Sequence, residues 1–157
     1  MKRLVAVCAI LVFLADGSPA GANDSSARSV SDLAREYREL RAKRRQRPPG
    51  VRLKELDDSG GRLEQTLSAL GEALGRPPHT SKEIVKSLGA PDAIRNDREM
   101  TRFLGIYERE RRKSASELKP RHDRKYFIYF WRGWHDFLFF ISEGGVIVDH
   151  GWWFAYE

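Results

Sequence analysis

The chain has 157 residues, and its 28 lysines and arginines against 22 aspartates and glutamates give a formal net charge of +6. This length fits one domain with short appendages. An apolar content of 41% and an aromatic content of 11% exclude a wholly disordered chain. The single cysteine excludes an internal disulfide and a cysteine-based metal cluster.

Residues 1–22 have the three-part layout of a secretory signal peptide. Two basic residues follow the initial methionine, residues 4–15 are apolar, and Ala20 and Ala22 are the small residues that a signal peptidase accepts. The apolar stretch is shorter than the roughly 20 residues that a membrane-spanning helix needs, so an uncleaved anchor is the weaker alternative. The sequence therefore predicts cleavage after Ala22 and a secreted or periplasmic mature chain without a transmembrane span.

Residues 23–58 are expected to form a basic, partly helical and flexible N-terminal region. Apolar side chains with helical spacing predict a helix with a narrow apolar stripe, formed by Leu33, Tyr37 and Leu40. Bases without any acid follow between residues 41 and 54. Continued like charge favours extension over docking, so deletion of residues 23–54 is expected to lower the melting temperature by only a few degrees.

Residues 59–157 are expected to form an α+β domain, in which N-terminal helices pack on a C-terminal three-stranded antiparallel β-meander. Leucines at helical spacing predict a helix that ends at Gly75, and they are Leu63, Leu67, Leu70 and Leu74. Thr80 and Glu83 form a capping box that opens a short helix ending at Gly89. Apolar spacing predicts one more helix from residue 97 to about 112.

From residue 125 the pattern changes to that of strands. Residues 125–131 and 134–142 are aromatic and β-branched, and Arg132-Gly133 offers a tight turn between them. A second turn at Glu143-Gly144-Gly145 leads to a last strand, whose alternate residues are expected to face the helices: Val146, Val148, His150, Trp152, Phe154 and Tyr156.

Residues 78–157 resemble known families. The capped helix Thr-Ser-Lys-Glu-Ile-Val-Lys-Ser-Leu-Gly-Ala-Pro-Asp, Thr80 to Asp92, precedes an aromatic meander with a Glu-Gly-Gly-Val turn. This combination is similar to the BamE-like (SmpA/OmlA) small outer-membrane lipoproteins, whose two helices against a three-stranded antiparallel sheet also occur in secreted β-lactamase inhibitory proteins. The segment Trp-Arg-Gly-Trp-His-Asp from Trp131 and the ending Trp-Trp-Phe-Ala-Tyr-Glu resemble uncharacterised small, largely fungal proteins. The first resemblance implies protein binding rather than catalysis.

Candidate chemistry is confined to His135, Asp136 and His150. Adjacent residues of a strand point to opposite faces, so His135 and Asp136 are not placed to form a catalytic pair. A metal site would need these ligands on one face. We expect His135 to pack against indoles and Asp136 to be a turn carboxylate. The sequence thus predicts no enzyme, no metal and no cofactor.

The preferred functional hypothesis is recognition of a protein partner, of unknown identity, by an exposed aromatic sheet surface. Its residues are Tyr129, Trp131, Trp134 and Trp153. Large aromatic side chains with a polar tip stay soluble and still anchor a partner. The alternative is that the first helices fold back across this aromatic face of the sheet and cover it.

The second hypothesis is binding to an anionic surface, which is a polymer, a lipid headgroup or a cell wall. The residues proposed for it are Arg41, Lys43, Arg44, Arg45 and Arg47, together with Arg109, Arg111, Arg112 and Lys113. Secretion argues against nucleic acid as the partner. The competing interpretation is a solvated helix face that needs no partner.

Overall fold

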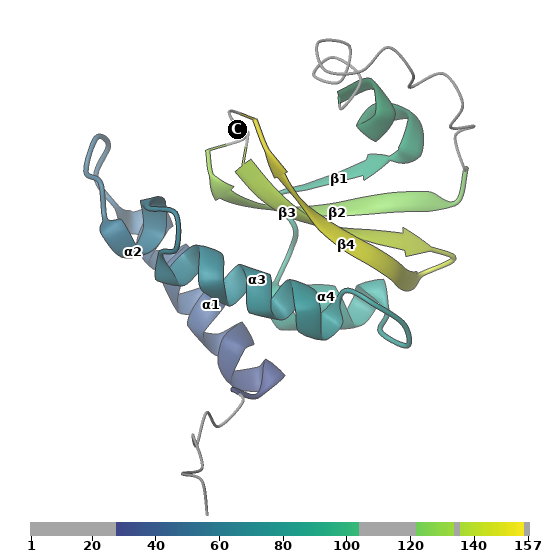
Figure 1. Ribbon diagram of the computed structural model, residues 1–157, viewed down its shortest axis with the longest axis horizontal. Helices are drawn as coiled ribbons and strands as arrows, with labels where there is room; N and C mark the ends of the chain where they lie inside the picture. Colours follow the sequence, from purple (N-terminus) through teal and green to yellow (C-terminus); the bar gives the residue numbers. More distant parts are fainter. Residues whose placement is uncertain (1–27, 104–121, 134–135, 156–157) are drawn as a thin grey trace, which may run out of the picture.

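The computed structural model describes residues 28–103, 122–133 and 136–155. The expected fold class, α+β with the helices before the sheet, is confirmed (Figure 1). In chain order the elements are α1 (Val30–Gln46), α2 (Lys54–Asp57), α3 (Arg62–Leu74), α4 (Ser81–Leu88), β1 (Ala93–Asn96), β2 (Arg124–Arg132), β3 (Asp136–Glu143) and β4 (Val146–Phe154). A further helix begins at Asp97, and its described part runs to residue 103. None of the helices within the described ranges has the length and apolarity needed to cross a membrane.

The sheet has four antiparallel strands in the described residues, in the order β1-β2-β3-β4, where three were expected. The additional strand is β1, which pairs with β2 from Ala93 opposite Ile128 to Asn96 opposite Lys125. Its sequence, Ala-Ile-Arg-Asn, does not alternate between apolar and polar residues, so it gives no strand signal. The strand forms because β2, which lies far along the chain, offers it a free edge.

Both faces of the sheet are covered by helical segments (Figure 1). On one face, Phe127, Tyr129 and Trp131 of β2 pack into a core with α1, α3 and α4. On the other face, the alternate side chains of β2, such as Ile128, pack with Met100 of the helix that begins at Asp97. The alternative that the first helices cover the aromatic face is correct for Tyr129 and Trp131, on which α1 packs, whereas the opposite face is covered by this later helix.

Helix α1 belongs to the core, which corrects the expectation of a flexible region separate from it. Leu33, Tyr37 and Leu40 are at most 7% exposed, and α1 contacts α3 and α4. The ring of Tyr37 meets that of Tyr129 edge-on, with 6.2 Å between centroids. Burial of three such side chains contributes roughly 4.5–9 kcal/mol as an upper bound, at about 1.5–3 kcal/mol each. The charge that was expected to keep this helix away from the core is paired with carboxylates described below.

The central helices follow their local sequence signals. The four leucines of α3 are all buried, and the helix ends at Gly75 as expected. At α4 the Thr80 side chain accepts from the backbone of Glu83, and the Glu83 carboxylate accepts from the backbone of Thr80. Gly89 then ends α4 with a φ of 81°, a conformation that residues with a Cβ rarely adopt.

The last strand follows the expected alternation over only part of its length. His150, Trp152 and Phe154 lie on the helix-facing side as expected, opposite Phe140, Leu138 and Asp136 of β3. Tyr156 lies outside the described residues. Val146 and Val148 are instead exposed, while Ile147 is fully buried. The cause is a register shift between Ile141 and Ser142 that leaves Val148 without a partner in β3, and such a bulge reverses the phase of the strand.

Candidate functional site

The aromatic residues expected to bind a partner are mostly core residues. Tyr129 and Trp131 are at most 1% exposed and face α1, α3 and α4. Their polar atoms have internal partners, since Tyr129 Oη donates to the Gly89 carbonyl at 3.0 Å and Trp131 Nε1 donates to the Leu56 carbonyl at 3.0 Å. An exposed binding patch that includes these two residues is therefore wrong. Trp134 lies outside the described residues.

Trp153 lies on the opposite face of the sheet. It is half-buried, and its ring meets that of Phe103 with 6.0 Å between centroids. The structure thus separates Trp153 from Tyr129 and Trp131 by the thickness of the sheet, and these residues do not share one surface.

The basic residues proposed to meet an anionic surface differ in what they contact. Arg41 is 7% exposed and forms an ion pair with Asp92 at 2.5 Å between Nη2 and Oδ1. Lys43 is bonded to Glu55. The side chain of Arg45 is 65% exposed and lies 3.9 Å from Asp92. Arg44 and Arg47 are described below, and Arg109, Arg111, Arg112 and Lys113 lie outside the described residues.

Arg44 and Asp92 complete the free edge of β2. The Phe130 N–H donates to Asp92 Oδ2 at 2.9 Å, and Arg44 Nη1 donates to the carbonyls of Phe130 at 2.6 Å and Trp131 at 2.5 Å. Burial lowers the pKa of Arg44, an effect that the Asp92 charge opposes. Side chains thus bond the part of the β2 edge that short β1 does not reach. Arg41 and Arg44 are structural residues, and sequence reasoning missed Asp92, the partner of Arg41.

The buried phenols beside this cluster are held in their neutral form. Burial raises the pKa of Tyr37 to about 12, and the neighbouring Arg41 charge opposes this shift. Burial also raises the pKa of Tyr129. The Arg41 guanidinium lies 5.9 Å from the centroids of both rings, so the cation contacts their π-faces within the distance at which such contacts are favourable.

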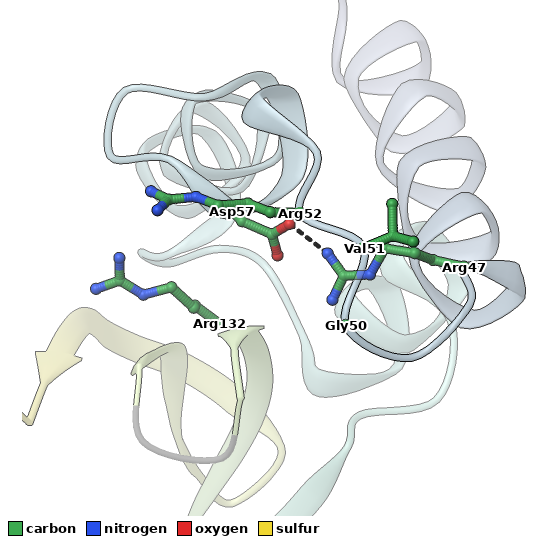
Figure 2. A pocket seen from close by; sticks show the side chains of 6 residues that line it. All are labelled: Arg47, Gly50, Val51, Arg52, Asp57 and Arg132. Carbon is green, nitrogen blue, oxygen red and sulfur yellow. Dashed lines mark hydrogen bonds and ion pairs between the residues drawn. The ribbon is translucent and has the colours of Figure 1, made fainter.

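A pocket opens where the end of α1, the loop after it and the end of β2 meet (Figure 2). Its volume is about 380 Å³, and it is lined by Arg47, Gly50, Val51, Arg52, Asp57 and Arg132. The lining thus contains three guanidinium groups and one carboxylate. Arg47 and Arg52 come from the basic segment noted in the sequence, whereas Arg132, considered there only as a turn residue, lies far along the chain.

Carboxylates hold the three arginines of the pocket in place. Arg47 is bonded to Asp57. Arg52 Nε donates to Asp58 Oδ1 at 2.9 Å, and Arg132 Nε donates to Asp136 Oδ2 at 2.9 Å.

Arg132 and Asp57 have further partners besides these ion pairs. The guanidinium of Arg132 lies 4.8 Å from the ring of Trp131. Burial would raise the pKa of Asp57, but hydrogen bonds from Arg47 and from the Leu53 N–H outweigh it and lower that pKa. Asp57 is therefore a charged anchor at neutral pH.

Comparisons with known proteins give no match. No family model, no curated protein and no solved structure shows significant similarity to the chain. The resemblances to BamE-like and fungal proteins stay predictions.

Of the three residues considered for catalysis, the structure describes Asp136 and His150, and these two contact different partners. His135 lies outside the described residues. Asp136 is 1% exposed, and its carboxylate accepts from Arg132 and from the Ala155 N–H. His150 packs against α3, with Nε2 3.5 Å from Glu72. Within the described ranges no three His, Cys, Asp or Glu residues are grouped as a metal site requires.

Proposed function

We propose that this protein is an exported, non-catalytic binding domain that recognises an anionic partner through Arg47, Arg52 and Arg132. The observation that carries the proposal is the convergence of three arginines, from separate segments, on one pocket whose lining contains a single carboxylate. Among the described residues of the two surfaces that the sequence suggests, those with mainly exposed side chains belong to the basic one. The side chains of Arg52 and Arg132 are 72% and 45% exposed.

The arginines are suited to a ligand because their inner bonds orient them without using all their donors. A guanidinium has five N–H donors in a fixed fork. Arg132 uses Nε for Asp136, and no bond from its two terminal nitrogens is seen among the described residues. Figure 2 shows the Arg47–Asp57 ion pair at one side of the pocket and the terminal nitrogens of Arg52 and Arg132 toward the other. Such pre-orientation lowers the entropic cost of binding.

The surrounding charge favours the same kind of ligand. Arg45 and Lys43 near the end of α1 have side chains that are 65% and 55% exposed. Summed positive charge raises the local concentration of anions and their association rate, in a manner that salt suppresses. A polyanion would thus be attracted over the end of α1 and held at the pocket.

The test is retention on immobilised heparin as a function of salt. Retention of the wild type is expected to fall roughly tenfold or more between about 50 and 200 mM salt. The double variant Arg52→Gln/Arg132→Gln should elute at clearly lower salt than Arg35→Gln/Arg62→Gln. This control loses the same two charges from side chains that are 65% and 64% exposed and lie at another hollow. Equal elution of the two variants, or a wild type that is not retained, would contradict the proposal.

Export is supported by the composition of residues 1–22 and has its own test. Mass spectrometry of the mature N-terminus is expected to find cleavage after Ala22. An intact Met1 in the folded protein would overturn the localisation and leave the pocket unaffected.

A further inference from the structure

We infer that the pocket receives a phosphomonoester group that is the end of a larger molecule, an inference that rests on the proposed function and names the ligand of that same site. Each arginine of the lining is paired with one carboxylate: Arg47 with Asp57, Arg52 with Asp58 through Nε and Nη2, and Arg132 with Asp136 through Nε. Among the described residues no bond is seen for Nη1 of Arg52 or for the two terminal nitrogens of Arg132, and these donors remain for the ligand. A phosphomonoester carries about −1.5 to −2 charges at neutral pH, whereas a carboxylate or a sulfate ester carries a single charge.

The directions of the arginines also suit a tetrahedral group. A carboxylate is planar and is satisfied by one guanidinium fork. Arg52 comes from the loop after α1 and Arg132 from the end of β2, and their side chains enter the pocket from different elements (Figure 2). A phosphate presents three oxygens on one end and accepts from both guanidinium groups at once.

The pocket is also larger than an inorganic anion requires. Its volume of about 380 Å³ lies in the range of small-molecule sites. Val51, which is 43% exposed, offers an apolar contact beside the arginines. Gly50 leaves open space there, since a Cβ at this position would have no neighbour within 4 Å outside the adjoining residues. The group to which the phosphate is attached would occupy this part of the lining.

The probes that test this inference are phenyl phosphate and phenyl sulfate, compared by titration calorimetry on the full mature chain. Phenyl phosphate is expected to bind at least about tenfold more tightly, because its dianion forms stronger charge-assisted hydrogen bonds with the free donors of both arginines than a monoanion does. Its affinity should fall about fourfold from about pH 7.5 to about pH 5.5, as the phosphate gains a proton with a pKa of about 6. The affinity of phenyl sulfate should not change in that way.

Two variants locate the site, each checked for folding by its thermal transition. Arg52→Gln should weaken phenyl phosphate about tenfold. Arg132→Lys keeps the charge and loses the fork, and it should weaken the same probe several-fold. Arg62→Gln, which removes an exposed arginine elsewhere, should leave the affinity unchanged. If either pocket variant fails to fold, the other still decides the question.

Equal affinities for the two probes, or a loss in Arg62→Gln as large as in Arg52→Gln, would overturn the inference. Retention on heparin would then persist, so a failure here is distinct from a failure of the proposed function. Vesicles of phosphatidylcholine doped with phosphatidic acid distinguish the source of the group. Binding to them that is lost in Arg52→Gln places the phosphate on a lipid headgroup, and no binding to them beside tight phenyl phosphate places it on a soluble molecule.

Discussion

Removal of the Asp92 carboxylate should destabilise the protein far more than removal of an exposed acid. Asp92 holds Arg41 at 2.5 Å, and the two side chains are only 14% and 9% exposed. It also accepts from the Phe130 N–H at 2.9 Å. Loss of one partner of a buried ion pair costs about 3–5 kcal/mol, because the other charge stays buried without compensation. A typical domain has about 5–15 kcal/mol in total, so Asp92→Ala should lose a large part of its stability.

The assay is urea unfolding of Asp92→Ala, Arg41→Met and the double variant. We expect each single variant to lose about 3–5 kcal/mol and the double variant to lose clearly less than their sum, by about 2 kcal/mol. Asp58→Ala is the control, because its partner Arg52 is 72% exposed, and it should cost no more than about 1 kcal/mol. An Asp92→Ala variant that costs as little as the control, with additive effects in the double variant, would refute the view that this pair docks α1 onto the sheet.

Three further predictions follow from the packing. Gly75→Ala should cost at least about 1–3 kcal/mol in urea unfolding, because its Cβ would lie 2.1 Å from His150 Nδ1; an unchanged midpoint would contradict the contact. Burial raises the pKa of Tyr37 to about 12 and also raises that of Tyr129. The free energy of unfolding should therefore be intact below about pH 10 and fall above it, where the phenols ionise in the unfolded chain only. A free energy of unfolding that stays constant up to about pH 12 would contradict their burial. Deletion of residues 23–54 should abolish the cooperative thermal transition, since it removes the buried side of α1, and a transition that is only a few degrees lower would restore the flexible-region view.

The elements that the sequence predicted are those decided by nearby residues. The capping box at Thr80 and Glu83 is complete within four residues, and the leucines of α3 define one helical face without reference to the rest of the chain. Strand β1 and the docking of α1 depend on partners that are distant in sequence. Ala93 pairs with Ile128, and Arg41 reaches Asp92. A basic segment is expected to repel itself and stay extended unless the carboxylates that neutralise it can be identified, and Asp92 is distant in sequence from Arg41.

The same reasoning explains what was missed at the pocket. The excess of bases after α1 was visible in the sequence, and it indicated an anionic partner. It did not show that Arg41 and Arg44 are bonded to Asp92 and to strand carbonyls while Arg52 stays in solvent. Arg132 carried no signal at all, because its neighbour Gly133 marks a turn. Likewise, aromatic composition alone does not distinguish Trp131 in the core from a surface anchor.

The central claim is that Arg47, Arg52 and Arg132 form one anion-binding site. The most direct measurement is the NMR signal of each arginine Nε–H group in ¹⁵N-arginine-labelled protein, titrated with phenyl phosphate at low salt. The Nε signals of these three residues should shift together along one saturating curve. Those of Arg35 and Arg62, which lie at another hollow, should stay in place. Shifts of equal size at Arg35 and Arg62, or shifts that do not saturate, would contradict it.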